Sequence, residues 1–399
     1  MSILLIINVI KLVLATSPFL NFNGDYSKPE NLIKLNGLQK TLGSVLLTDY
    51  LPRNFVRDGS IDYTSFIQIA LIKNPNIVFP DFPVLINDSG LEIPSDRTLT
   101  FLKGSELRMK PSSKRGYDML KMRNAHNVKL INPVLIGDRY RHLGREGEWG
   151  MGISINGGSN ITVLDPIVRE MWGDGIYIGP QNGVIPRNIT IKNAILTYNR
   201  RDGISIIAVD GLLLDSPYAA FSNGTLPMGG IVIEPDNNSD EIKNVLIVNP
   251  RTQENVGTGI LVDFGNLMGG GQKKVSVTVL NHYDLKSKRG VKAMSRVSDG
   301  TSTIKGDLKF VNPRWYNNSE TAIFTILFGL NDVRLTIENP LIRDSNNSQL
   351  SKKETLNYLT YKNRINRDAW HEIRFSTGWP KHLLNWVSNS MWHYRDWIF

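Results

Sequence analysis

The sequence has 399 residues, of which 41% are hydrophobic and 21% charged, and this composition excludes a largely disordered chain. Cysteine is absent, which excludes a disulfide scaffold, a thiolate zinc site and a cysteine nucleophile. The net charge of +9 favours anionic partners, but no basic stripe with interleaved aromatic residues points to nucleic acid.

Residues 1–50 are predicted to form an N-terminal segment that caps the fold. Within it, the stretch from Ile3 to Ala15 is an apolar run of signal-peptide length, which Lys11 interrupts and no basic residue precedes. Two interpretations stay open: an export signal within residues 1–17 that is cleaved, or a buried strand or helix. The run is too short to cross a bilayer, so we expect no membrane span.

The middle of the chain repeats one short phrase, a small residue followed by branched apolar, polar and apolar residues. The copies are Gly152-Ile-Ser-Ile, Gly175-Ile-Tyr-Ile, Gly203-Ile-Ser-Ile, Gly230-Ile-Val-Ile and Gly259-Ile-Leu-Val, with looser copies starting at Gly116, Gly290 and Ala322. A second phrase alternates with the first. It is a β-rich run closed by Asn or Asp and usually followed by Pro, as at Asn132-Pro133 and Asn249-Pro250. Each unit therefore holds two or three short strands and no crossover helix.

This pattern predicts an all-β fold, a right-handed parallel β-helix wound from a single chain over residues 51–345. Branched residues at alternate positions would point inward and stack in columns, and the recurrent Asn or Asp would form a ladder at the turns. A β-propeller is the alternative at this repeat length, but it needs four strands per blade and regular tight hairpin turns.

The repeat alignment also indicates where chemistry could lie. Asp174 and Asp202 precede the small residue in two consecutive units, so they should stack about 4.8 Å apart, one strand spacing. Like charges that close raise the pKa of one partner, and such a pair suits a general acid and base. The alternative is that both belong to Asp-Gly turns without any chemical role.

Aromatic and basic residues follow the same register. Trp149 and Trp172 would form an aromatic shelf for a sugar ring, and Arg200 and Arg201 could bind a carboxylate or sulfate on that sugar. The alternative is that the indoles only fill a bend of the coil. An insertion over residues 137–149 would line the same groove, unless it is merely a solvated loop.

The predicted site residues divide into two groups. The candidates for catalysis are Asp174, Asp202, Glu148 and His142; those for substrate binding are Trp149, Trp172, Arg200, Arg201, Arg139 and Tyr177. Glu234 and Asp263 end later strands and could extend the groove wall, without a catalytic role. No metal-ligating motif is present.

Residues 57–71, with an Asp-Gly, an Asp, a Thr and an Ile-Gln, resemble the opening of the pectate-lyase superfamily, and Val78-Phe79-Pro80 resembles its first core strand. The resemblance implies a parallel β-helix whose first helix caps the coil. The superfamily includes polysaccharide lyases, glycoside hydrolases, epimerases and phage tailspikes, so the resemblance specifies the fold better than the activity.

The coil pattern is also similar to polygalacturonase-type glycoside hydrolases, and this similarity implies catalytic roles for Asp174 and Asp202. The sequence departs from that family in three respects. Arg201 replaces an Asp, Gly229 stands where a His would be, and no Arg-Ile-Lys follows. Only the two aspartates carry over.

The sequence therefore predicts an enzyme that cleaves the glycosidic bonds of an acidic extracellular polysaccharide, with hydrolysis preferred and no cofactor. One alternative is a lyase that acts by β-elimination, for which the resemblance implies an Arg base (Arg200 or Arg201) and calcium. An alternative of another class is a non-catalytic, tailspike-like or surface glycan-binding protein. The expected location is secreted, extracellular or periplasmic, or on a virion.

Residues 346–399 differ sharply in composition from the coils. They contain five of the eight tryptophans, Trp370, Trp379, Trp386, Trp392 and Trp397, in a basic and aromatic context. We expect this segment to form a C-terminal cap, or a tail through which the chain forms a homo-oligomer, because interfaces are enriched in Trp, Tyr and Arg.

Overall fold

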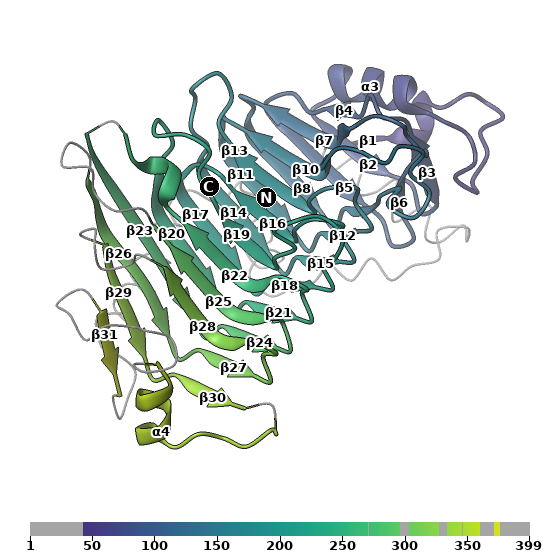
Figure 1. Ribbon diagram of the computed structural model, residues 1–399. Helices are drawn as coiled ribbons and strands as arrows, with labels where there is room; N and C mark the ends of the chain where they lie inside the picture. The colour runs from purple at the N-terminus through teal and green to yellow at the C-terminus, as the bar shows by residue number, and fades with distance from the viewer. Residues whose placement is uncertain are drawn as a thin grey trace, which may run out of the picture.

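The computed structural model describes residues 43–269, 271–295, 303–326, 333–344, 346–359 and 371–375. The chain winds as a right-handed parallel β-helix, which confirms the predicted fold class (Figure 1). Every strand pair in its three sheets is parallel and in register. The solenoid runs from α3 (Thr64–Lys73) at one end to α4 (Lys352–Asn357) at the other. No helix in the described part of the chain has the length and apolarity to cross a bilayer.

Three sheets, named A, B and C here, form the walls of the solenoid. Sheet A contains β1 (Val45–Leu46), β2 (Asn76–Phe79), β5 (Arg97–Phe101), β8 (His126–Ile131), β11 (Ser159–Leu164), β14 (Arg187–Lys192), β17 (Val209–Asp215), β20 (Ile242–Val248), β23 (Gln272–Leu280), β26 (Thr303–Val311), β29 (Val333–Glu338) and β31 (His371–Arg374). These strands carry the second sequence phrase. The sheet extends past residues 51–345 at both ends, through β1 and β31, because backbone pairing does not depend on the repeat motif.

Sheets B and C complete each coil. Sheet B contains β3 (Pro83–Ile86), β6 (Glu106–Met109), β9 (Val134–Ile136), β12 (Ile167–Arg169), β15 (Ile195–Thr197), β18 (Tyr218–Ala220), β21 (Arg251–Gln253), β24 (Tyr283–Leu285), β27 (Arg314–Tyr316) and β30 (Leu341–Arg343). Sheet C contains β4 (Leu91–Glu92), β7 (Gly116–Arg123), β10 (Trp149–Asn156), β13 (Ile176–Gly179), β16 (Ile204–Ile206), β19 (Ile231–Ile233), β22 (Thr258–Asp263), β25 (Arg289–Met294) and β28 (Thr321–Ile326). Sheet C carries the first sequence phrase.

The core consists of stacked branched side chains, as the alternation predicted. One buried column on sheet C follows the strand register and consists of Ile153, Ile176, Ile204, Ile231, Ile260, Val291 and Ile323. The small residue that opens each phrase faces the same interior. A Cβ on Gly203 would lie 2.4 Å from the carbonyl oxygen of Gly230 and 2.8 Å from the Cβ of Ala219. The phrase therefore opens with a small residue because the coil is narrow at that corner.

The recurrent Asn or Asp between sheets A and B forms the predicted ladder. Asn281 has a left-handed backbone with φ of 57°. Its side-chain amide donates to Asn249 Oδ1 over 2.8 Å, and its own Oδ1 accepts from Asn312 Nδ2 over 3.2 Å. Asn suits the position because it tolerates a left-handed backbone and carries both a donor and an acceptor.

Two substitutions at Asn281 separate the contribution of the ladder hydrogen bonds from that of the left-handed backbone. Asn281→Gly removes the ladder bonds but keeps the left-handed backbone, and we expect it to lower the free energy of unfolding by about 1 kcal/mol. Asn281→Ala adds the left-handed backbone strain of a residue with a Cβ, and should cost about 1 kcal/mol more. Urea unfolding measures both. Equal losses in the two variants would show that the backbone conformation contributes nothing.

A helix closes the N-terminal end, as the resemblance implied. In α3, Ile67, Ala70 and Leu71 are buried against the first coil. Asp62 precedes the helix and accepts from the Thr64 backbone N–H over 3.0 Å and from the Thr64 hydroxyl over 2.6 Å. Residues 1–42, which include the candidate export signal, lie outside the described residues, and so do the five C-terminal tryptophans.

A buried polar cluster lies inside the coils between sheets B and C. Trp315 Nε1 donates to His282 Nδ1 over 3.1 Å, and Thr252 Oγ1 lies 2.8 Å from His282 Nε2 and donates to Asp284 Oδ1 over 2.6 Å. Burial lowers the pKa of His282 to about 3 and raises that of Asp284 to about 7. Both side chains are therefore neutral in much of the acidic range, and the cluster is a structural element of the interior.

Candidate functional site

The aspartates predicted to stack do so, beneath one arginine. Asp174 and Asp202 precede β13 and β16 at equivalent positions, and both are fully buried. Arg201 Nη1 lies 2.8 Å from Asp174 Oδ2 and 3.4 Å from Asp202 Oδ2. The other oxygen of each carboxylate accepts a backbone N–H of the next coil: Asp174 from Asp202 over 3.1 Å, and Asp202 from Gly229 over 2.7 Å.

The electrostatics of the pair follow from burial and proximity. Burial raises the pKa of Asp174, and burial together with the Asp174 charge raises that of Asp202 well above its usual range. Arg201 partly offsets both effects. Burial alone would lower the pKa of Arg201, but the surrounding carboxylates, led by Asp174 and Asp202, raise it above its usual value. The guanidinium therefore keeps its proton.

Two further carboxylates, both more exposed than the aspartates, flank the same guanidinium. Glu148 Oε2 lies 3.7 Å from Arg201 Nε, and Glu234 Oε2 lies 4.0 Å from Arg201 Nη2. Their side chains are 37% and 32% exposed, whereas Asp174 and Asp202 have no exposed surface. A ligand on the outer face of sheet C can therefore contact the two glutamates directly.

The environment of Glu234 differs from that of an ordinary surface glutamate. Burial raises its pKa, Asp263 and Asp236 raise it further, and Arg201 acts in the opposite direction. Tyr177 lies on the outer face of β13, in register with Ser205 on β16. The pKa of Tyr177 is raised by burial and by Asp236, Asp174 and Asp240, so its hydroxyl stays protonated.

The insertion before β10 is a fixed structural element. Asp138 is fully buried and accepts from His142 Nδ1 over 2.8 Å, from the Tyr117 hydroxyl over 2.5 Å and from the Ser112 backbone N–H over 2.8 Å. The His142 side chain is itself buried and stacks on Trp172, with ring centroids 3.8 Å apart. His142 is therefore placed to hold the loop and does not face a ligand on sheet C.

Only one of the two indoles of the predicted aromatic shelf is exposed. Trp149 is 54% exposed, but Trp172 is only 7% exposed. The insertion folds His142 against the Trp172 ring, and the Arg200 guanidinium carbon also lies 3.8 Å from that ring's centroid. Only Trp149 offers an open indole face to a sugar ring.

The other predicted cations are bound to backbone carbonyl groups. Arg200 Nη1 donates to the carbonyl of Gly147 over 2.6 Å and to that of Trp172 over 3.3 Å. Arg139 donates to the carbonyls of Tyr198, Asn199 and Asn223. Both side chains thus connect the insertion to later coils.

The structure brings together Asp174, Asp202, Glu148, Arg201 and Tyr177 of the predicted residues, with Trp149 beside Glu148. His142 and Arg139 of the insertion, with Trp172 and Arg200, form a separate group that holds the insertion against the coils. The sequence analysis placed Glu234 on the groove wall and did not predict a catalytic role for it. The available signal was its position directly after β19, in a phrase that aligns with the Asp202 phrase one coil earlier. In the described part of the chain, no group of three or more His, Asp or Glu is arranged to hold a metal ion.

No family model matches this sequence. Among curated proteins, "Uncharacterized protein YclG" of Bacillus subtilis (strain 168) is 27% identical over 240 residues, which is 51% of this chain and 41% of that protein. The SPbeta prophage-derived uncharacterized protein YorA of the same strain is 27% identical over 141 residues, which is 32% of this chain and 24% of that protein. The chain thus spans less than half the length of these curated relatives.

Two solved structures illustrate the fold. The A-module of the Azotobacter vinelandii mannuronan C-5 epimerase AlgE4 superposes with a TM-score of 0.52 at 14% identity, covering 76% of this chain and 89% of the module. Gene product 12 of bacteriophage phi29, in its pre-mature form, superposes with a TM-score of 0.57 at 16% identity, covering 79% of this chain and 48% of that protein. Identities this low establish a shared fold alone. The chain is a right-handed parallel β-helix protein, with the fold that its resemblance to the pectate-lyase superfamily implies.

Proposed function

We propose that this chain binds a polysaccharide along the outer face of sheet C and hydrolyses it at the site around Arg201. The observation that carries the proposal is the pair of partly exposed carboxylates, Glu148 and Glu234, on either side of one guanidinium. Glycoside hydrolysis needs two carboxyl groups that face the same bond, one protonated and one ionised. Of the two, Glu234 is the one whose pKa burial raises.

In this mechanism Glu234 is the general acid, because burial raises its pKa above the usual value of a glutamate. Glu148 is the base or nucleophile, and its Oε2 lies 3.7 Å from Arg201 Nε. The buried Asp174 and Asp202 are positioning residues that fix Arg201 between the two glutamates. Their predicted role as the acid and base themselves stays a prediction that the variants in the Discussion test.

Hydrolysis is favoured over elimination because neither Arg200 nor Arg201 is available as a base. Arg201 is surrounded by carboxylates that hold its proton, so it is a poor base. Arg200 has a pKa lowered by burial and by Arg139, but its guanidinium is occupied by Trp172 and two carbonyl groups. Neither side chain is free to take a proton from a sugar carbon.

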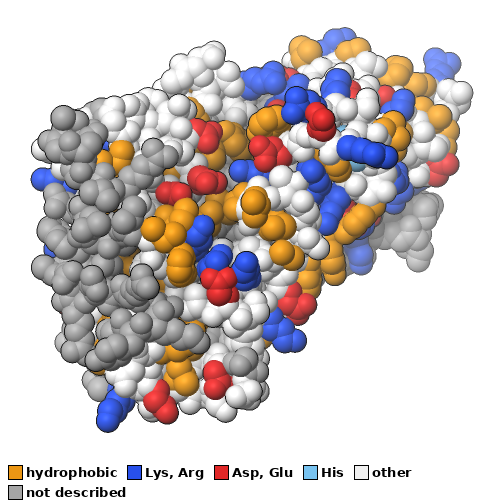
Figure 2. All heavy atoms as spheres, viewed as in Figure 1, with side chains coloured by type: hydrophobic (Ala, Val, Ile, Leu, Met, Phe, Trp, Pro, Cys, Tyr) orange, Lys and Arg blue, Asp and Glu red, His pale blue; other side chains and the backbone are white. Residues whose placement is uncertain are grey.

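The proposed substrate is an acidic polysaccharide. The net charge of +9 supports an anionic ligand, and Lys121 and Arg123 lie on β7, two strands from Tyr177. On the face shown in Figure 2, Lys and Arg side chains are interspersed with Asp and Glu, so the attraction is local. The AlgE4 module, which shares the fold, is named for its action on mannuronan.

Glycan binding without cleavage is the second candidate. It is supported by the phage origin of gene product 12 and the prophage origin of YorA. In either case we propose an extracellular or virion-associated location. Assembly of the chain into a homo-oligomer through residues 346–399 also remains a proposal.

The test is a panel of acidic and neutral polysaccharides incubated with the full chain. We expect reducing ends to appear from an acidic member, without the near-ultraviolet absorbance of an unsaturated uronate and without sensitivity to a calcium chelator. Growth of that absorbance would identify elimination instead. Binding that weakens with rising salt, with no release of reducing ends, would identify a binding protein.

A further inference from the structure

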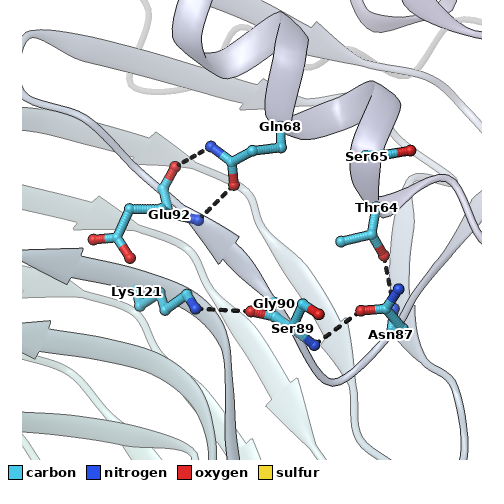
Figure 3. Close-up of a pocket in the computed structure, with 8 residues that line it drawn as sticks. All are labelled: Thr64, Ser65, Gln68, Asn87, Ser89, Gly90, Glu92 and Lys121. Atoms are coloured by element: carbon cyan, nitrogen blue, oxygen red, sulfur yellow. Dashed lines mark hydrogen bonds between the residues drawn. The ribbon is translucent and has the colours of Figure 1, made fainter.

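A cavity of about 350 Å³ lies at the N-terminal end of sheet C, between the start of α3 and the strands β4 and β7 (Figure 3). Its walls come from three separate segments of the chain. Ser65 and Gln68 project from α3, Asn87 and Ser89 from the turn before β4, and Lys121 from β7. No predicted site residue lines it.

The walls are held in place by hydrogen bonds. The Gln68 side-chain amide pairs with both backbone groups of Glu92, donating to the carbonyl over 2.9 Å and accepting from the N–H over 2.8 Å (Figure 3). The backbone N–H of Asn87 donates to Thr64 Oγ1 over 2.8 Å. A cavity with walls fixed in this way needs little ordering when a ligand enters.

Gly90 lines the cavity at the turn before β4 and packs against β7. Its backbone is left-handed, with φ of 61°, and a Cβ at this position would lie 1.8 Å from the carbonyl oxygen of Asp118. No other residue fits without moving β7. Gly90 therefore fixes the turn directly against the β7 backbone.

The cavity offers hydroxyl groups and one ammonium group to a ligand. The hydroxyls of Ser65 and Ser89 make no hydrogen bond within the described residues. Lys121 Nζ donates once, to the Ser89 carbonyl over 2.7 Å, and keeps two further N–H groups. The Glu92 carboxylate lies 3.2 Å from Arg123 Nη1, so its charge is balanced. Hydroxyl groups beside one cation suit a sugar that carries a carboxylate.

Strand register aligns this cavity with the site around Arg201. Glu92 pairs with Lys121, Lys121 with Ser154, Ser154 with Tyr177, and Tyr177 with Ser205. Ser205 Oγ donates to Asp202 Oδ2 over 3.2 Å. From Lys121 to Ser205 there are three strand spacings, about 14 Å at 4.8 Å each. One register line thus joins the two places, and along it Tyr177 is partly exposed while Ser154 and Ser205 are buried.

We propose that the cavity is a terminal subsite, which holds a uronic-acid unit at one end of a glycan whose scissile bond lies over Glu148 and Glu234. The inference rests on the proposed function. Because a chain end fixed in the cavity sets the distance to the site, cleavage should release short products of one length. Oligosaccharides long enough to reach both places should bind more tightly than shorter ones.

The test uses the full chain and a panel of oligouronates of increasing length: oligogalacturonates, oligomannuronates and hyaluronan fragments. Ser65→Trp fills the cavity from the exposed start of α3. Ile72→Trp is the matched control, since Ile72 is also exposed on α3 but does not line the cavity. Lys121→Met removes the cation with little change in volume. Titration calorimetry measures binding, and reducing-end assays with product sizing measure cleavage.

We expect at least one series to bind the wild type and Ile72→Trp about tenfold more tightly once it spans both places, and this gain to disappear in Ser65→Trp and weaken in Lys121→Met. The same length dependence in Ser65→Trp, with correctly folded protein, would overturn the terminal subsite even if cleavage persists. Length-dependent binding without any release of reducing ends would instead overturn the hydrolase and leave the subsite standing. Failure of every series to bind the wild type would overturn the subsite.

Discussion

Replacing Glu234 by Gln is expected to lower kcat for polysaccharide hydrolysis by at least about 10²-fold, because a general acid contributes typically 10²- to 10⁴-fold. KM should change little, since Gln keeps the size and polarity of the side chain. Glu148→Gln should lose activity to a similar extent. Reducing-end release under initial-rate conditions, on the polysaccharide that the panel identifies, measures both variants.

Asp263→Asn is the matched control for this experiment. Asp263 raises the pKa of Glu234, so its neutralisation should lower that pKa. A general acid must be protonated to act, so activity falls as pH rises through its pKa. The variant should therefore keep its maximal rate while the alkaline limb of its pH–rate profile moves to lower pH.

Asp174→Asn distinguishes the two assignments of the acid and base. Asn retains an oxygen that can accept from the Asp202 backbone N–H, but it removes one of the charges that hold Arg201. If Asp174 is a positioning residue, Asp174→Asn should lower the activity less than Glu234→Gln does. Full activity in Glu234→Gln combined with loss in Asp174→Asn would return the chemistry to the buried pair.

Arg201→Met is expected to lower the free energy of unfolding by about 3–5 kcal/mol, the cost of leaving buried charges without their partner. Asp174 and Asp202 have no exposed surface and share this one guanidinium, so its loss leaves two buried carboxyl groups without the cation that favours their charged forms. Arg187→Met is the control. The Arg187 side chain, paired with Asp210, is 53% exposed, and its loss should cost no more than about 1 kcal/mol.

The loss in Arg201→Met should depend on pH in a defined direction. Without the guanidinium, the folded-state pKa of both aspartates rises further above the unfolded value. The folded protein then binds more protons than the unfolded chain, so stability falls as pH rises. The destabilisation should thus be smaller near about pH 4 than near about pH 8, measured by urea unfolding. A loss that is equal at both pH values would show that the aspartates are not left charged in the interior.

The sequence was sufficient to predict the solenoid because its signals are local and repeated. The phrase Gly203-Ile-Ser-Ile specifies a strand that begins at a narrow corner, and the Asn281 turn specifies a left-handed residue with ladder bonds. Each copy in the sequence strengthens the inference from the others, and the register of Asp174 with Asp202 follows by counting.

The burial and the neighbours of each side chain could not be predicted from the repeat in this way. Trp172 has the same register position as Trp149, yet a histidine from the insertion covers it, and the path of an insertion is not periodic. Glu234 acquires its raised pKa from burial, from Asp263 on the next coil and from Asp236 in the loop that follows it. The cavity beside α3 depends on Gly90 and on a helix whose contacts lie outside the repeat. These features depend on packing between segments that the repeat does not relate.

The outward positions of sheet C have a consequence for how specificity can change. Ser154, Tyr177, Ser205, Val232 and Leu261 each belong to a different coil and lie about 4.8 Å apart along one line. Of these five side chains only Tyr177 is partly exposed, because the other four are buried, so Tyr177 is the one that can touch a bound polymer. A variant library that aims to change the preferred sugar at this line should therefore vary Tyr177, while the inward residues that stabilise the coil stay unchanged.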